Sequence, residues 1–241
     1  TRVAPKLRAS SLRTVESNNI KDHFHPVPHH LPLRARPPKK GREGSGAALH
    51  LLERQIMNFQ ALATPAGGAS AVVADALIVV LAADGKAATG DKALDGAIAA
   101  ATKAGDFERK AGRTLYLHNV EGVKSQRVVL SGARDASAKA FRAAVTAGLA
   151  ALKNRAVKHL AVLAGEGAGA AHAEALAVAV EHASYTYQHT KPSAEVVAMP
   201  TKVSLVADKA ALAELKQGLV QGQAIGAGMN VAREAANRPA N

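Results

Sequence analysis

The sequence ALIVVLA, residues 76–82, is a continuous apolar run rich in Val and Leu, and it decides the fold class. A run of this length and composition is typical of a strand that is buried on both faces. Beyond it, Leu94, Ile98 and Ala101 recur at helical spacing, and Gly105 provides a C-terminal stop. A buried strand followed by an amphipathic helix predicts an α/β fold.

The same alternation continues on both sides of this run. Further strands are predicted at MNFQALAT (57–64), RTLYLHNV (113–120), RVVLSGA (127–133), HLAVLA (159–164) and EVVAMPTKVSLVA (195–207). Two helices are predicted between them: one is capped by Ser137 and has a stripe of Phe141, Val145, Leu149 and Leu152, and the other presents Leu176, Val180, Ala183 and Tyr187. From residue 76 the order is βαββαβαβα. It predicts a mostly parallel mixed sheet between two layers of helices.

A last helix is predicted from Asp208, a favourable N-cap residue, with one face formed by Leu212, Leu215, Leu219, Gly222, Gly226 and Met229. Each glycine inside a helix costs about 1 kcal/mol relative to alanine. Glycines on the packing face therefore indicate that another backbone approaches closely. The predicted interdomain or assembly residues are Gly222, Gly226, Met229, Asn237, Pro239 and Asn241.

Residues 1–56 differ from the rest, because HPVPHHLPLRARPPKKGREGSG combines prolines, basic residues and a Gly/Ser end without lasting periodicity. This composition predicts a disordered basic extension. The segment is also Arg-rich and poor in acids, as organellar transit peptides are. A second interpretation is that the chain truly starts at Met57, where the first strand pattern begins, and that the upstream part is an extension or a start-site artefact.

Composition excludes several functions. The chain has no cysteine, which rules out disulfides, cysteine-bound zinc and thiol catalysis, and this fits a reducing cytoplasmic setting. No apolar run reaches the roughly 20 residues of a membrane span. The net charge of +12 favours polyanions such as DNA, but aromatic residues make up only 3%, which offers little surface for stacking bases.

No motif in the sequence indicates an active site. GEGAGAA (165–171) has a loose phosphate-loop spacing, but Glu181 falls inside a helix and Glu195 comes too late to serve as the ribose-binding acid, so a plain turn is favoured. The remaining polar candidates fail on context. Pro26 and Pro28 keep the His23–His30 region extended, which suits only adventitious metal binding, while Ser131 lacks a nucleophile elbow. His118, His159, His172, His182 and His189 are predicted to be surface or strand-end residues.

Three stretches resemble the N-terminal domain of the leucyl aminopeptidase, or cytosol aminopeptidase, family. They are GRTLYLHNVEGVKSQRVVLSGAR (112–134), EALAVAVEHASYTYQHTKP (174–192) and GLVQGQAIGAGMNVAREAANRPAN (218–241). Tyr185, Tyr187 and Lys191 match the family's second motif, where Tyr187 and Gln188 replace the usual Phe and Asp. Asn237, Pro239 and Asn241 match its N-x-P-x-N exit, and the resemblance spans about residues 57–241.

This resemblance implies a macro-domain-like fold, with 1–56 as the extension, 57–207 as the α/β domain and 208–241 as the connecting helix and the start of a linker. In the family, two divalent metal ions (manganese or zinc) are held by a catalytic domain that begins after the N-x-P-x-N exit. We therefore expect no catalytic, metal or cofactor residue in this chain, and no activity from it alone. The implied partners are the catalytic domain and the other subunits of a homohexamer. DNA binding, as in some bacterial members, and ADP-ribose-type binding, by fold analogy, stay open as alternatives.

Overall fold

The computed structural model describes residues 57–84, 89–190, 193–194, 196 and 198–238, and all of them fall within one compact unit. The predictions for residues 1–56, Lys191, Pro239 and Asn241 lie outside the described residues.

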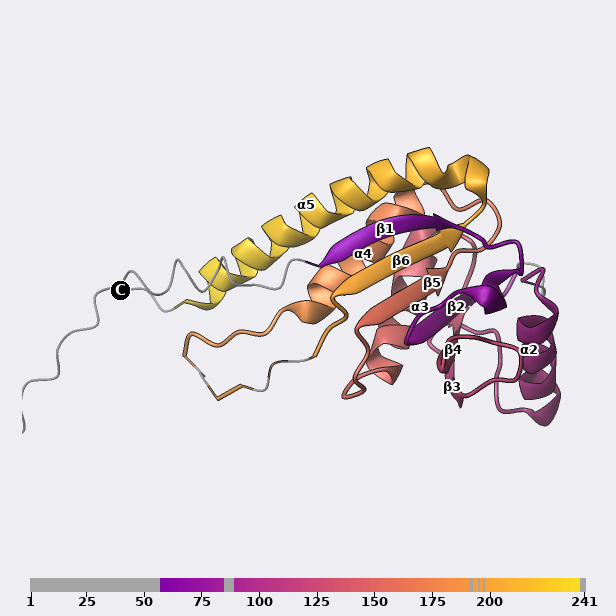
Figure 1. Ribbon diagram of the computed structural model, residues 1–241. Helices are drawn as coiled ribbons and strands as arrows, with labels where there is room; N and C mark the ends of the chain where they lie inside the picture. Colours follow the sequence, from indigo (N-terminus) through magenta and orange to yellow (C-terminus); the bar gives the residue numbers. More distant parts are fainter. Residues whose placement is uncertain (1–56, 85–88, 191–192, 195, 197, 239–241) are drawn as a thin grey trace, which may run out of the picture. The chain divides into compact units, whose positions relative to one another are not determined.

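Six strands form one sheet in the order β1-β6-β5-β2-β4-β3 (Figure 1). Neighbouring strands are parallel except for β3, which runs antiparallel to β4 at one edge. The strands are β1 (Asn58–Ala63), β2 (Ala76–Ala82), β3 (Thr114–His118), β4 (Arg127–Ala133), β5 (His159–Leu163) and β6 (Lys202–Ala207). The predicted mostly parallel mixed sheet is confirmed.

Helices cover both faces of this sheet. They are α2 (Lys92–Ala104), α3 (Ala138–Ala151), α4 (Ala170–Ser184) and α5 (Leu212–Asn237), with short 3₁₀ turns η1 (Ala69–Ala71) and η2 (Lys209–Ala211). Because strand side chains alternate between faces, Ile78 of β2 belongs to the core cluster that includes residues of α3, α4 and α5, whereas Leu77 and Val79 belong to the cluster that includes residues of α2 and η1. The run at 76–82 is thus buried from both sides, as its composition predicts.

Local signals fix the helix ends where the sequence places them. The Asp91 side chain accepts hydrogen bonds from the backbone N–H groups of Ala93 and Leu94 and so caps α2, which Gly105 ends in a left-handed conformation. The Ser137 hydroxyl accepts a bond from the Ala140 N–H and caps α3.

Three predicted boundaries are wrong. The last strand begins at Lys202, and the described residues 198–201 of the predicted segment lie outside it, because Pro200 has no N–H with which to extend the ladder. Helix α4 ends at Ser184, so Tyr187 lies beyond it. Helix α5 begins at Leu212 after η2, and the Asp208 side chain makes no capping hydrogen bond.

Candidate functional site

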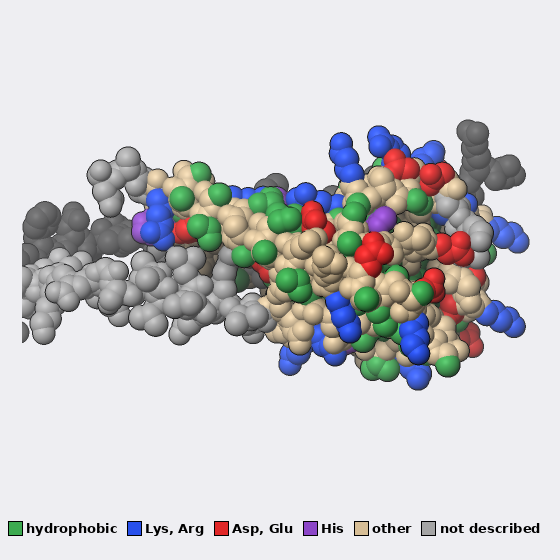
Figure 2. All heavy atoms as spheres, turned by 90° about the horizontal axis from the view of Figure 1, so that it is seen from above, with side chains coloured by type: hydrophobic (Ala, Val, Ile, Leu, Met, Phe, Trp, Pro, Cys, Tyr) green, Lys and Arg blue, Asp and Glu red, His purple; other side chains and the backbone are tan. Residues whose placement is uncertain are grey.

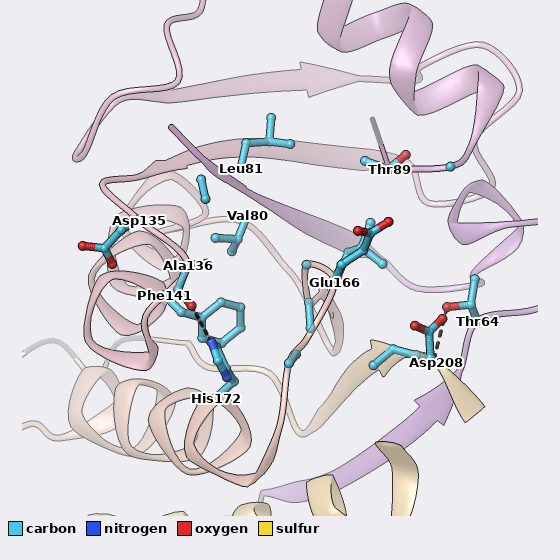
Figure 3. Close-up of a pocket in the computed structure, with 17 residues that line it drawn as sticks. Thr64, Val80, Leu81, Thr89, Asp135, Ala136, Phe141, Glu166, His172 and Asp208 are labelled. Atoms are coloured by element: carbon cyan, nitrogen blue, oxygen red, sulfur yellow. Dashed lines mark hydrogen bonds between the residues drawn. The ribbon is translucent and has the colours of Figure 1, made fainter. Parts of the chain in front are cut away.

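A cavity of about 400 Å³ lies at the carboxyl ends of β2, β5 and β6 (Figure 3). Parallel α/β sheets commonly bind ligands at this edge. Its apolar part includes Val80, Leu81, Phe141 and Leu163. Its polar part consists of Thr64, Thr89, Asp135, Glu166, His172 and Asp208, and no described lining residue is Lys or Arg.

His172 ties two loops of this cavity together. Its Nδ1 accepts a hydrogen bond from the Gly169 N–H at 3.3 Å, so its proton lies on Nε2, which donates to the Ala136 carbonyl oxygen at 2.8 Å (Figure 3). Both ring nitrogens are therefore engaged, and the ring also packs edge-on against Phe141. This histidine fastens the start of α4 to the start of α3.

The acidic side chains of the cavity differ in their engagement. Asp135 accepts hydrogen bonds from the Ser137 hydroxyl and N–H and pairs with Arg134, and these contacts lower the pKa of Asp135 to about 2. In Figure 3 its carboxylate points away from the other lining side chains. The Asp208 carboxylate is exposed and has no hydrogen-bond or ion-pair partner among the described residues.

A carboxylate of the chain itself occupies the N-terminus of α4. Oε1 of Glu214, from the first turn of α5, accepts a hydrogen bond from the Ala170 N–H at 2.9 Å. A Cβ on Gly169 would lie 2.5 Å from that oxygen, so glycine makes room for it. The Glu214 carboxylate therefore occupies the position at the N-terminus of α4 where a phosphate would bind. This geometry agrees with the interpretation of residues 165–171 as a plain turn.

Three of the four glycines of α5 face α4 of the same unit. Cβ atoms added at Gly218 and Gly222 would lie 2.1 Å and 2.5 Å from the carbonyl oxygens of Ala170 and Glu174, and one at Gly226 would lie 2.5 Å from the Glu181 Cβ. A backbone does approach closely, as predicted at Gly222 and Gly226. That neighbour is α4, however, so the close approach requires no second domain, and an interdomain role for these two glycines stays a prediction.

The outward face of α5 carries exposed apolar side chains. Val220, Ile225 and Val231 are 67%, 44% and 63% exposed, and a Cβ added at Gly228 would meet no atom within 4 Å. No charged residue occurs between Lys216 and Arg233. Figure 2 looks down on α5, where green and uncharged side chains run along the helix. Met229 is half-buried beside this face.

The last turn of α5 is bonded to the segment that follows α4. This exit cluster consists of Tyr185, Tyr187, Glu234, Asn237 and Arg238. Asn237, predicted from the exit motif, is one of its members. The tyrosine hydroxyls are a contribution that the sequence did not reveal, because these partners lie about 50 residues apart.

Basic side chains collect at the amino ends of the parallel strands. The Asp75 carboxylate accepts hydrogen bonds from the backbone N–H groups of His159 and Lys158, which lower its pKa, and Arg127 reaches the Asp75 carbonyl. The basic edge consists of Lys124, Arg127, Lys153, Arg155, Lys158 and Lys202. His118 and His159 occupy strand ends there, as predicted.

Two further properties concern the described residues alone. Their His, Asp and Glu side chains form no group of three that could hold a metal ion. None of their helices is long and apolar enough to cross a membrane.

The fold and these surfaces define an α/β domain whose final helix presents an uncovered apolar face. Residues 78–193 match the model of the cytosol aminopeptidase family, N-terminal domain. The chain belongs to this family through its N-terminal domain, which confirms the resemblance seen in the sequence.

The relatives are longer proteins. The chain is 49% identical over 185 residues to a probable cytosol aminopeptidase of Methylibium petroleiphilum, covering 77% of this chain and 38% of that protein. A probable cytosol aminopeptidase of Verminephrobacter eiseniae is 37% identical over 185 residues, covering 77% of this chain and 35% of that protein. The chain thus spans little more than a third of the length of these relatives.

Two solved structures share the fold. A mutant of tomato leucine aminopeptidase has a TM-score of 0.57 and 20% identity, covering 76% of this chain and 38% of that chain. The bottromycin maturation enzyme BotP in complex with Mn has a TM-score of 0.50 and 20% identity, covering 69% of this chain and 32% of that chain. At this identity the two structures support the fold alone.

Proposed function

We propose that this chain is the non-catalytic N-terminal domain of a leucyl aminopeptidase, a metal-dependent exopeptidase that removes N-terminal amino acids from peptides. Its role is assembly and interdomain packing through the outward face of α5. The observation that carries this proposal is the exposure of Val220, Ile225 and Val231 on the part of α5 between Lys216 and Arg233, which has no charged residue. Apolar surface gathered in this way favours a protein contact.

Gly228 supports a close contact at the same face. A glycine in a helix interior costs about 1 kcal/mol relative to alanine. Gly218, Gly222 and Gly226 are explained by α4, but a Cβ at Gly228 would point into open space. A neighbour packed closely on the outward face would explain why residue 228 is a glycine, as α4 explains the other three.

The metal chemistry belongs to the part of the relatives that this chain does not match. The family resemblance implies that two manganese or zinc ions are bound in that part, and the bottromycin maturation enzyme BotP, which shares the fold, has been solved in complex with Mn. We assign no catalytic, metal-binding or cofactor-binding role to any residue of this chain.

This proposal predicts that the purified chain does not hydrolyse leucine-p-nitroanilide, with or without added Mn²⁺ or Zn²⁺. The matched control is the Methylibium petroleiphilum relative, assayed in the same buffer. Hydrolysis that survives repurification of the chain and disappears with a chelator would contradict the proposal.

DNA binding is a second candidate, favoured by the basic edge. Six Lys and Arg side chains lie near the amino ends of the strands, and Asp75 there is already engaged by backbone N–H groups. Phosphate contacts make affinity fall steeply with salt. In a filter-binding titration, Lys158→Glu with Lys202→Glu should then weaken binding and flatten the salt dependence, whereas Lys103→Glu on α2 should not. If Lys103→Glu weakens binding as much as the double variant, DNA binding through the basic edge is ruled out.

ADP-ribose-type binding rests on fold analogy alone. The cavity lining counts against an anionic ligand, because the Asp and Glu side chains among its described residues are not balanced by a described Lys or Arg, and Glu214 fills the N-terminus of α4. We expect no heat of binding with ADP-ribose in calorimetry, and a saturable heat would contradict this expectation.

A further inference from the structure

The end of α5 is held by side chains from outside the helix. The last carbonyl groups of an α-helix have no partner within it. Here the Tyr187 hydroxyl donates to the carbonyl oxygen of Asn237, the final helical residue, at 2.6 Å. One of the helix's unpaired acceptors is therefore satisfied by a tyrosine 50 residues away.

A second tyrosine holds the side chains of the same turn. The Tyr185 hydroxyl donates to Oε2 of Glu234 and accepts from Nδ2 of Asn237, both at 3.3 Å. The guanidinium of Arg233 lies 5.7 Å from the centre of the Tyr185 ring. Oε1 of Glu234 in turn accepts from Arg238 at 3.4 Å and 3.5 Å.

The backbone changes direction at this cluster. Arg238 is extended, with φ −74° and ψ 135°, because the residue before a proline is pushed out of helical geometry. Tyr185 is itself the extended residue that ends α4, with φ −74° and ψ 122°. The C-terminal ends of α4 and α5 are thus joined by the hydrogen bonds of the exit cluster.

We propose that Tyr185 and Tyr187 are positioning residues that fix the last turn of α5 and so set the direction in which the chain leaves the domain. Helix α5 has 26 residues, which makes it about 39 Å long at 1.5 Å per residue. Gly218, Gly222 and Gly226 bring α5 close to α4 as far as residue 226, and the buried Asn230 side chain donates to the Glu181 carbonyl oxygen at 3.2 Å one turn further on. The exit cluster holds the last turn of the helix, beyond Asn230.

The biological value of a fixed exit rests on the proposed function, because the direction of the chain matters most if α5 leads to a packed neighbour. Whether Tyr185 and Tyr187 fix the last turn is a property of this chain alone. The positioning role can therefore be disproved while the proposed function stands, and the proposed function can be disproved while the positioning role stands.

The absence of cysteine allows two spin labels to be placed uniquely, at Lys103→Cys on α2 and at Ala236→Cys in the last turn of α5. Both positions are exposed. Pulsed electron spin resonance should give a narrow distance distribution, and Tyr185→Phe with Tyr187→Phe should broaden it about twofold. The matched control is Tyr116→Phe on β3, where the hydroxyl lies 3.5 Å from His118 Nδ1.

Hydrogen exchange provides a second readout. Loss of one or two hydrogen bonds should speed exchange of the Ala235, Ala236 and Asn237 amides about three- to tenfold, while the midpoint of thermal unfolding stays unchanged. A merely structural role would lower that midpoint and spread the faster exchange through α4 and α5. The inference is overturned if the double variant matches Tyr116→Phe in both readouts, or if unfolding is lowered without a selective effect on the last turn.

Discussion

Asp91 shows how one buried side chain can join two elements. Besides capping α2, its carboxylate accepts a hydrogen bond from the Ser70 N–H in η1 at 2.8 Å, and the residue is only 5% exposed. Burial raises the pKa of Asp91, but the bonds from Ser70, Leu94 and Ala93 together lower it below the ordinary value. The charged carboxylate therefore stabilises the fold.

Asp91→Ala should lower the free energy of unfolding at pH 7 by about 2 kcal/mol, because three N–H groups lose their acceptor. Asp91→Asn keeps one acceptor oxygen and should cost less. Since the folded pKa is depressed, the stabilisation is present above the unfolded pKa of about 4 and is lost as the pH falls through the folded pKa. Urea unfolding at pH 7 and pH 3 should show the gap between wild type and Asp91→Ala narrowing. A gap independent of pH would contradict the assignment.

Sequence predicts residues of this kind only in part. The end of α2 at Gly105 and the start of α3 at Ser137 follow from local chemistry, and the sequence predicted both. The bond from Ser70 to Asp91 joins residues 21 apart, and the bond from His172 to Ala136 joins residues 36 apart. Contacts of this type depend on how elements pack, so no local pattern predicts them.

At the scale of elements, α5 has two faces with opposite responses to the same substitution. A Cβ at Gly222 would lie 2.5 Å from the Glu174 carbonyl oxygen, whereas a Cβ at Gly228 would meet nothing. Gly222→Ala should therefore destabilise the chain by about 2 kcal/mol through overpacking. Gly228→Ala should stabilise it by about 1 kcal/mol through helix propensity.

Both variants can be compared by urea unfolding at one pH, each serving as the other's control. Equal changes in the free energy of unfolding would show that the two faces of α5 are not distinguished by α4. The spacing of glycines predicted that a backbone approaches α5. It could not predict which one, because periodicity shows the residues that share a face and not the element that packs there.

At the scale of the whole molecule, the alternation of strands and helices predicted the sheet and its layers, since each buried strand has its own apolar run. The cavity was beyond such reasoning. Thr64, Phe141, Glu166 and Asp208 come from four distant segments and meet only because their strands and helices end at one edge of the sheet. No spacing in the chain brings them together.

The uncovered face of α5 predicts how the molecule behaves in solution. Light scattering at increasing concentration should show self-association of the chain. Val220→Lys with Val231→Lys should reduce it while leaving thermal unfolding unchanged, because both side chains are exposed. Val73→Lys is the matched control, since Val73 is 72% exposed but precedes β2. If Val73→Lys reduces self-association as much as the double variant on α5, the contact does not lie on the outward face of α5.

The most direct measurement of the central claim is made on a chimera. In it, residues 57–241 replace the matching segment of the Methylibium petroleiphilum relative, and its mass and hydrolysis of leucine-p-nitroanilide are measured together. The proposed function predicts an active assembly of six subunits, which Val220→Lys with Val231→Lys disrupts while Val73→Lys does not. An inactive, unassembled chimera whose domains are folded, or one that tolerates both lysines on α5 with full assembly and activity, would contradict it.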